Sequence, residues 1–206
     1  MASYEEYKTK TAGLTEYVDA TMNRRFRAIL AAIPAGSRVL DVACGSGTLM
    51  HALEAKGCKP RGIDIAPGAI EHAKAKKLDA ILGDADSFES DPKVRELMLS
   101  EYDVVVFSKS LAYLKRKNEL MKALRTKKVI VNQRNPSYWR AVLARWRGTT
   151  SESPIEELPY VAADGRKIPQ TSLHALREWG ESYGFKSKVL LGNFFRSRDA
   201  VTLFYR

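Results

Sequence analysis

The first part of the chain repeats a buried strand followed by a helix, and this alternation constrains the fold more than any other feature. Residues 38–42 form a short apolar run typical of a buried strand, and a helical pattern follows over residues 48–56. The unit recurs as a strand over residues 61–65 and a helix that begins at Pro67. Parallel strands need crossover connections that bring helices over both faces of a sheet. The sequence therefore predicts an α/β domain with a mostly parallel central sheet.

Further strands are expected along the chain at residues 80–82, 103–107, 129–132, 188–193 and 201–205. Further helices are expected at residues 16–33, 118–124, 136–146 and 172–183. The last two strands have no helical pattern between them, so we expect them to pair as an antiparallel hairpin at one edge of the sheet. Residues 148–170 are rich in Thr, Ser, Pro and Gly without a sustained period, and they are interpreted as a long loop or flap.

Composition bounds the class of protein. The chain has 206 residues, of which 45% are hydrophobic, which suits a single domain over residues 1–206 with a helical arm at 1–33. No run approaches the roughly 20 apolar residues of a membrane span, and the N-terminal sequence lacks the pattern of a signal peptide. A cytoplasmic protein with no membrane partner is expected. Cys44 and Cys58 form neither a CxxC pair nor a Cys/His array, so no disulfide or metal site is predicted.

A small-residue loop follows the first strand, in the segment VLDVACGSGTL at residues 39–49. A strand, a glycine loop and a helix in this order let the backbone approach a ligand closely. The dinucleotide-binding fingerprint would need a third glycine at position 50, which is Met50, so a pyrophosphate ligand is disfavoured. Asp64, at the end of the second strand, follows Asp41 by 64 − 41 = 23 residues. That offset is suitable for a carboxylate that binds ribose hydroxyls.

Four segments, VLDVACGSGTL, GIDI, GDADSF and YDVVVFSKSL, resemble motifs one to four of the class I S-adenosylmethionine-dependent methyltransferases. The resemblance implies a Rossmann-like class I methyltransferase fold, with a seven-stranded, mostly parallel sheet, a C-terminal antiparallel strand pair and helices on both faces. It also implies S-adenosyl-L-methionine as cofactor, S-adenosyl-L-homocysteine as product, and a transferase of the methyltransferase class.

The same resemblance assigns the cofactor-binding residues. It implies that the loop backbone from Ala43 to Gly47 cradles the methionine part, with Asp41 near the amino group and Asp64 on the ribose. The full set of expected cofactor residues is Asp41, Ala43, Cys44, Gly45, Gly47, Thr48, Asp64, Ile65, Asp84, Ala85, Asp86 and Ser108. Asp84, Ala85 and Asp86 would border the adenine, and Ser108 would lie beside the methyl group. The alternative for each aspartate is a helix cap or a turn residue.

A narrower resemblance lies in the C-terminal half, in the segments NPSYWR, RWRG, LPY and IPQTSL within residues 135–173. These segments are similar to those of MetW-type proteins, related to the methyltransferase type 11 group and associated with methionine biosynthesis. The resemblance implies a homoserine acyltransferase as partner, with cofactor binding that serves regulation as much as catalysis. The run Asn135-Pro136-Ser137-Tyr138 also resembles the NPPY motif of nucleic-acid amino-methyltransferases. There, however, the motif follows the fourth strand, whereas here it follows the fifth.

Residues that could bind a methyl acceptor are aromatic or polar side chains expected near the same edge of the sheet. The candidates are Tyr4, Tyr7, Lys109, Tyr113, Asn135, Tyr138, Trp139 and Tyr160. The aromatic ones could equally be exposed on a terminal arm or packed in the core. No catalytic residue is assigned, because methyl transfer can rely on positioning of the nucleophile without a general base.

The formal net charge of +10 leaves a nucleic-acid substrate open. Its most concentrated source is the basic run between Lys115 and Lys128, which on a crossover helix is more often a solvated face. The sequence therefore predicts a methyltransferase for a small-molecule substrate. The alternatives are a MetW-like protein acting with an acyltransferase and an RNA methyltransferase.

Overall fold

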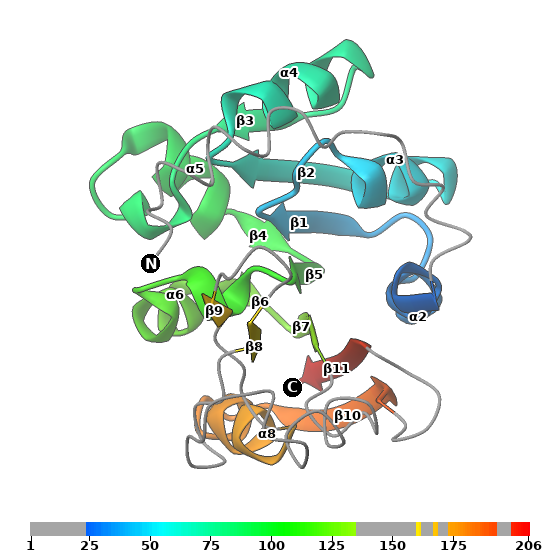
Figure 1. Cartoon of the computed structure of the whole chain (residues 1–206), viewed down its shortest axis with the longest axis vertical. Helices are drawn as coiled ribbons and strands as arrows, with labels where there is room; N and C mark the ends of the chain where they lie inside the picture. The colour runs from blue at the N-terminus through cyan, green and yellow to red at the C-terminus, as the bar shows by residue number, and fades with distance from the viewer. Residues whose placement is uncertain (1–23, 135–159, 162–166, 169–172, 193–198) are drawn as a thin grey trace.

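The structure of the protein is a computed structural model that describes residues 24–134, 160–161, 167–168, 173–192 and 199–206. Seven strands form one sheet in the order β10-β11-β7-β5-β1-β2-β3. Their bounds are β1 Arg38–Val42, β2 Lys59–Asp64, β3 Ala80–Leu82, β5 Val104–Ser108, β7 Lys128–Arg134, β10 Lys186–Leu191 and β11 Asp199–Tyr205. β3, β2, β1, β5 and β7 are parallel, whereas β11 runs antiparallel to both β7 and β10 (Figure 1).

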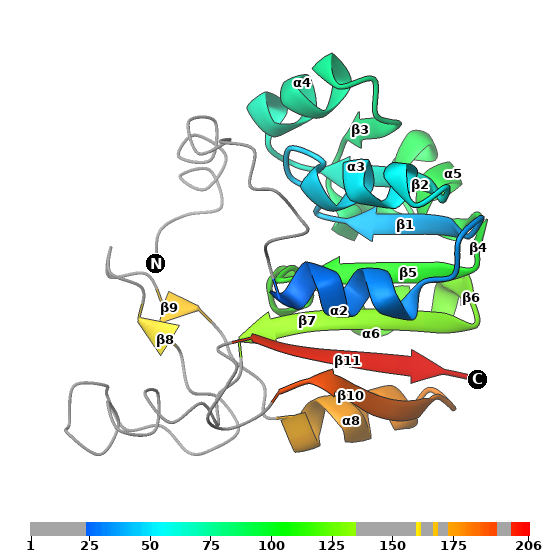
Figure 2. The same ribbon diagram turned by 90° about the vertical axis from the view of Figure 1, so that its right-hand side faces the viewer.

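The register brings the carboxyl ends of the parallel strands to one edge. Val42 of β1 pairs with Ile63 of β2 and with Phe107 of β5, so the residues just beyond them meet at the same place. Figure 2 shows β1 and β7 pointing toward this edge and β11 pointing away from it. We call it the carboxyl edge, and we call the opposite end of these strands the amino edge.

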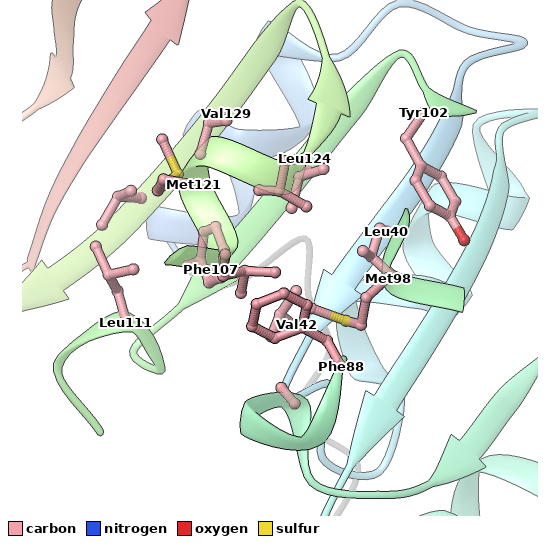
Figure 3. Close-up of a cluster of buried hydrophobic side chains, with 14 of the residues drawn as sticks. Leu40, Val42, Phe88, Met98, Tyr102, Phe107, Leu111, Met121, Leu124 and Val129 are labelled. Carbon is pink, nitrogen blue, oxygen red and sulfur yellow. The ribbon is translucent and has the colours of Figure 1, made fainter. Parts of the chain in front are cut away.

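One face of the sheet is covered by three helices, α5 (Pro92–Leu99), α6 (Lys117–Ala123) and α8 (Leu173–Glu181). Their apolar side chains, such as Met98, Met121 and Leu176, pack against alternate strand residues such as Leu40 and Phe107 (Figure 3). Alternate residues of a strand point to opposite faces, so a strand buried on both faces is apolar throughout. This accounts for the continuous run Val104 to Phe107.

The other face is covered by α2 (Arg24–Ala32) and α3 (Thr48–Ala55). Phe26, Ile29 and Leu53 pack there against Val39, Val106 and other strand residues of the opposite parity. A third, smaller cluster holds α4 (Pro67–Ala75) beside the loop after β1 through Ile70 and Cys44. The two helical layers confirm the predicted α/β class, the seven-stranded sheet and its antiparallel pair.

Several predicted boundaries were wrong. The second strand was expected over residues 61–65, but β2 begins at Lys59, because its start pairs with Arg38 of β1, and ends at Asp64. The helix α5 was not predicted, although Asp91 caps it by accepting hydrogen bonds from the Lys93 and Val94 N–H groups.

The expected flap over residues 148–170 contains two short strands, β8 (Tyr160–Val161) and β9 (Lys167–Ile168), which pair antiparallel. This pairing is regular structure that the loop interpretation did not foresee. The helix expected at 136–146, the rest of the flap and residues 1–23 of the expected arm lie outside the described residues.

Four small elements complete the described chain at the two edges. β4 (Glu101–Tyr102) and β6 (Arg125–Thr126) pair at the amino edge, and two 3-10 turns, η3 (Ala85–Ser87) and η4 (Leu111–Tyr113), follow β3 and β5. No helix within the described ranges is long and apolar enough to cross a membrane. The described side chains also contain no group of three or more His, Cys, Asp or Glu that could hold a metal ion.

Candidate functional site

A cavity of about 240 Å³ opens at the carboxyl edge, where β1, β2 and β5 end. It is lined by Arg25, Phe26, Asp41, Ala43, Cys44, Gly45, Ser46, Thr48, Leu49, Asp64, Ala66, Ala69 and Ser108. The structure therefore brings together Asp41, Ala43, Cys44, Gly45, Thr48, Asp64 and Ser108 from the residues expected to bind a cofactor.

The loop between β1 and α3 bends sharply at three left-handed residues. Ala43, Gly45 and Gly47 have φ angles of 61°, 57° and 76°. A Cβ on Gly47 would lie 2.2 Å from Cδ1 of Leu78, so glycine is required there for packing, and Gly47 itself does not line the cavity. A Cβ on Gly45 would meet nothing within 4 Å, so no other described atom covers the backbone on that side. The loop delivers the chain to Thr48, the first residue of α3, at the cavity wall.

Asp64 fixes this loop to the end of β2. Its carboxylate accepts hydrogen bonds from the Gly45 N–H and the Ala66 N–H, both at 2.8 Å, and its side chain is buried. The Cys44 N–H donates to the Ile63 carbonyl at 3.0 Å, which adds a second tie between the same two segments. A buried carboxylate bonded to backbone N–H groups is held rigidly. Ile65, the next residue, does not line the cavity.

Asp41 is the most unusual ionisable group of the site. Only 2% of the residue is exposed, and Oδ1 is buried with no hydrogen-bond partner among the described residues. Burial, together with the nearby Asp64 charge, raises the pKa of Asp41 to about 7. A buried carboxylate without a partner is costly. Among the described residues, the Asp41 Oδ1 therefore lacks a hydrogen-bond donor.

Arg25 is a lining residue that the sequence analysis missed. It belongs to the first turn of α2, and its guanidinium carbon lies 4.5 Å from the centre of the Phe26 ring. Burial lowers the pKa of Arg25, and the neighbouring Asp199 carboxylate partly opposes that effect. The helical pattern of apolar residues predicted that Phe26 would be buried. It gave no sign that this turn of the helix would reach the cavity.

Ser108, the last residue of β5, lines the cavity, and Lys109 follows it. The Ser108 hydroxyl lies 3.5 Å from Oδ1 of Asn132, and the Lys109 N–H donates to the Asn132 carbonyl at 2.8 Å. Lys109 has a φ of 63°, which is strained for a lysine, and its Nζ lies 3.4 Å from Oδ1 of Asp199. Strained residues of this kind cluster at functional sites.

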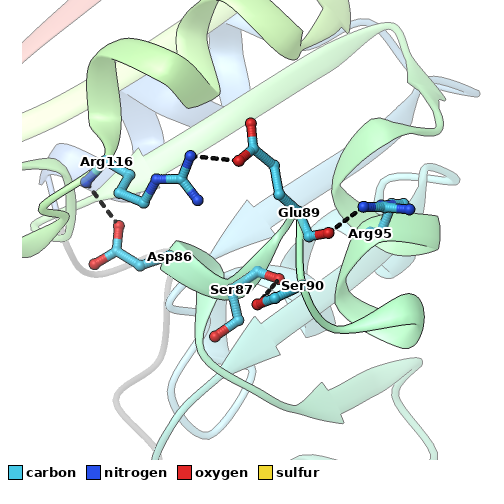
Figure 4. A network of polar contacts seen from close by, with 6 residues as sticks. All are labelled: Asp86, Ser87, Glu89, Ser90, Arg95 and Arg116. Atoms are coloured by element: carbon cyan, nitrogen blue, oxygen red, sulfur yellow. Dashed lines mark hydrogen bonds and ion pairs between the residues drawn. The ribbon is translucent and has the colours of Figure 1, made fainter.

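The residues expected around adenine are placed differently, because none of Asp84, Ala85 and Asp86 lines the cavity. Asp84 caps η3 by accepting from the Asp86 N–H at 2.9 Å, which is the helix-cap alternative. The Asp86 carboxylate accepts from the Lys115 and Arg116 N–H groups at 3.0 and 2.9 Å. Figure 4 shows this contact beside the ion pair between Arg116 and Glu89. An adenine-binding role for these residues stays a prediction.

The expected acceptor-binding residues are described only in part. Tyr113 lies in η4 and is 54% exposed, and Lys109 has been placed above. Tyr160 is the first residue of β8, and it is not among the residues that line the cavity. Tyr4, Tyr7, Asn135, Tyr138 and Trp139 lie outside the described residues.

The sequence pattern of a protein family described as "Methionine biosynthesis protein MetW" matches residues 23–196 of this chain. The chain belongs to the MetW family. The match covers every element that lines the cavity, from α2 to β5. It also includes the C-terminal segments on which the narrower resemblance rested.

Other known proteins are similar to this MetW-family chain over a smaller part or at lower identity. Aklanonic acid methyltransferase DauC of Streptomyces sp. (strain C5) is 34% identical over 83 residues, which are 38% of this chain and 37% of that enzyme. The chain therefore matches little more than a third of that relative's length.

Solved methyltransferase structures share the fold over nearly the whole chain. A SAM-dependent methyltransferase from Archaeoglobus fulgidus has a TM-score of 0.65 at 16% identity, covering 98% of this chain and 99% of that one. The magnesium protoporphyrin IX methyltransferase of Synechocystis PCC 6803, solved with bound SAH, also has a TM-score of 0.65, at 14% identity. That match covers 100% of this chain and 89% of the other. At these identities the likeness establishes the fold of the MetW-family chain.

Proposed function

We propose that this chain binds S-adenosylmethionine in the cavity at the carboxyl edge and transfers its methyl group to a small-molecule acceptor. The observation that carries the proposal is the charge of the cavity wall. Asp41 and Asp64 are both buried there, and Asp41 has an oxygen with no partner among the described residues. S-adenosylmethionine carries a sulfonium and an ammonium group, and two buried carboxylates complement these positive charges.

The backbone of the cavity fits the same ligand. The left-handed Ala43 and Gly45 leave the loop open to close approach, and the first turn of α3 begins beside it. Asp64 would exchange or share its present backbone partners with the ribose hydroxyls. Asp41 would accept from the ammonium group.

Transfer of the methyl group needs positioning more than proton chemistry. When bound, the cofactor supplies an electrophilic methyl group that a nucleophile attacks in line with the departing sulfur. Ser108 lines the cavity at the end of β5, and the strained Lys109 follows it directly, so an acceptor would approach here. Holding the two reactants in contact supplies much of the rate enhancement. The names of the related proteins, which include aklanonic acid and magnesium protoporphyrin IX methyltransferases, support an acceptor of small-molecule size.

Calorimetry and methyl labelling together test the proposal. The chain is expected to bind S-adenosylmethionine with one site per protomer and to move a labelled methyl group into a metabolite extract. Absence of binding would refute the cofactor assignment. Label that enters total RNA in place of the metabolite fraction would refute the small-molecule acceptor and support the RNA alternative.

A second candidate function is favoured by the family match, whose description names methionine biosynthesis. In this alternative the cofactor-bound chain acts through a homoserine acyltransferase, and cofactor binding serves regulation as much as catalysis. A stoichiometric complex with the acyltransferase, sensitive to cofactor and formed without label transfer, would support this alternative over the enzyme. Label transfer without such a complex would reject it.

A further inference from the structure

Arg25 reaches the cavity from outside the parallel strand-helix units. The helix α2 precedes β1 in the chain, crosses the face of the sheet, and brings its first turn to the carboxyl edge (Figure 2). There Arg25 and Phe26 join Asp41 and Asp64 in lining the cavity. Arg25 therefore lines a cavity that two acidic residues, Asp41 and Asp64, also line.

The Arg25 side chain is held in place by its neighbours. Phe26 is 7% exposed, so the ring beside the guanidinium is fixed by the core, and a guanidinium stacks well on an aromatic face. Asp199, at the start of β11, interacts electrostatically with Arg25 and also pairs with Lys109 at 3.4 Å. Asp199 is therefore a carboxylate that both Arg25 and Lys109 share, and it helps to fix where the Arg25 guanidinium lies.

The charges of the cavity create a difficulty for one end of the proposed ligand. Asp41 and Asp64 attract the sulfonium and the ammonium, but they repel the carboxylate on the same carbon as the ammonium. Among the described residues that line the cavity, Arg25 is the one basic side chain. Its planar fork of donors matches a carboxylate with two parallel hydrogen bonds.

We propose that Arg25 binds the carboxylate of the cofactor's amino-acid end, with Asp199 as its positioning residue; this rests on the function proposed above. The cavity then recognises a complete zwitterion, with carboxylates for the ammonium and a guanidinium for the carboxylate. The chain consequently selects S-adenosylmethionine over adenosyl compounds that lack the amino-acid carboxylate, such as decarboxylated S-adenosylmethionine.

The test compares two probes that differ in the carboxylate alone. Affinities for S-adenosylmethionine and for decarboxylated S-adenosylmethionine are measured by calorimetry on the unmodified chain and on Arg25→Met, Arg25→Lys, Asp199→Asn and Arg27→Met. Arg27 is the matched control, because it lies on the same helix, is exposed and does not line the cavity. Far-ultraviolet circular dichroism and thermal unfolding without ligand establish that each variant is folded.

Arg25→Met is expected to weaken binding of S-adenosylmethionine roughly ten- to hundredfold and that of the decarboxylated probe less than about threefold. Arg25→Lys should fall between, since a lysine keeps the charge and loses the fork. Arg27→Met should bind both probes as the unmodified chain does. Asp199→Asn should reduce the preference for the complete cofactor by a smaller factor than Arg25→Met.

Equal weakening for both probes would overturn the inference, because the loss would then come from packing and not from the carboxylate. Unchanged affinity of Arg25→Met for S-adenosylmethionine would overturn it as well. Both outcomes leave the proposed function standing, since the unmodified chain still binds the cofactor. If the unmodified chain binds neither probe, the proposed function itself fails.

Discussion

The two edges of the sheet are both charged and both hollowed, yet their charges are arranged differently. At the amino edge, a hollow of about 550 Å³ is more than twice the size of the cavity at the carboxyl edge and is lined by Arg38, Glu101, Asp103 and several other charged residues. Its charges face water: the Arg38 and Glu101 side chains are 54% and 71% exposed. At the carboxyl edge, Asp41 and Asp64 are 2% and 5% exposed.

The partners of these charges also differ. Asp103 accepts a hydrogen bond from the Arg38 N–H at 2.7 Å, and Arg38 lies 3.9 Å from Glu101. Solvated charges of this kind cost little to leave as they are. The buried Asp41 oxygen has no such partner among the described residues and pays a desolvation cost. The comparison favours the carboxyl edge as the ligand site, because of its buried carboxylate oxygen, which is unpartnered in the described part of the chain, and despite its smaller volume.

The largest difference between the two edges is expected when a side chain is added to a glycine at each edge. Gly45 and Gly36 both have positive φ angles and open space where a Cβ would stand. Gly45→Val should reduce cofactor affinity at least about a hundredfold, because its side chain projects where the ligand approaches. Gly36→Val carries similar backbone strain and should leave affinity unchanged. Calorimetry on both variants, with thermal unfolding as the control, measures the difference. Equal loss would mean that strain alone disrupts binding.

The next largest difference in cofactor affinity is expected when one carboxylate is removed at each edge. Asp64→Ala should weaken cofactor binding by about 1.5 to 3 kcal/mol, since it removes charge-assisted hydrogen bonds and frees the Gly45 N–H. Asp103→Ala removes a carboxylate that also bonds to a backbone N–H, but at the amino edge. It should not change cofactor affinity. A binding constant for Asp64→Ala equal to that of the unmodified chain would contradict the ribose assignment.

The raised pKa of Asp41 predicts a pH dependence of cofactor affinity. A pKa near 7 leaves Asp41 mostly protonated in the ligand-free chain at lower pH. A cationic ligand favours the ionised form, so affinity for S-adenosylmethionine should rise by up to about tenfold per pH unit from about pH 5 and level off near about pH 7. Asp41→Asn should bind more weakly above pH 7 and lose this slope. A slope that persists in Asp41→Asn would assign it to another group.

The same shift affects stability with the opposite sign. Ionisation of Asp41 is disfavoured in the folded chain, so its contribution to the free energy of unfolding is largest at low pH and declines between about pH 4 and about pH 7. Unfolding by urea at several pH values, with Asp41→Asn as the control, measures this decline. A free energy of unfolding with the same pH profile in both proteins would contradict the burial effect.

The smallest effect is expected from the basic residues of the amino edge. Arg125→Gln and Lys127→Gln should change cofactor affinity by less than about twofold, because surface charges interact weakly across a protein in salt. Both residues are exposed and line the larger hollow. Titrations at two salt concentrations measure any effect. A tenfold loss at moderate salt would show that the amino edge contributes to the site.

Local sequence was enough to predict most of the cavity. The loop Ala43 to Gly47 and the carboxylates Asp41 and Asp64 follow strands directly, so the parallel order of the strands fixes their place at one edge. Arg25 escaped prediction because it belongs to α2, whose position over the sheet depends on which strands its apolar face covers. No pattern within the helix encodes that docking.

The fold was predictable for similar reasons. The prediction failed where contacts with distant segments decide the structure. Buried strands contain continuous apolar runs, such as Val104 to Phe107 in β5, which identify them, but pairing with neighbours sets their ends. Lys59 and Pro60 extend β2 because they lie beside Arg38 and Val39, although neither residue favours a strand. The short pairing of β8 with β9 depends on contacts that a loop-like composition conceals.

The position of β11 has a consequence for how the chain assembles during synthesis. Among the described strands it is the latest to leave the ribosome, yet it inserts between β7 and β10. Until then β7 has an open edge, and neither Val201 nor Phe204 can fill its layer of the core. Unpaired apolar edges invite association with other chains. A nascent or truncated chain that stops short of Asp199 should therefore depend on chaperones, and Asp199 would reach Arg25 in one of the last steps of folding.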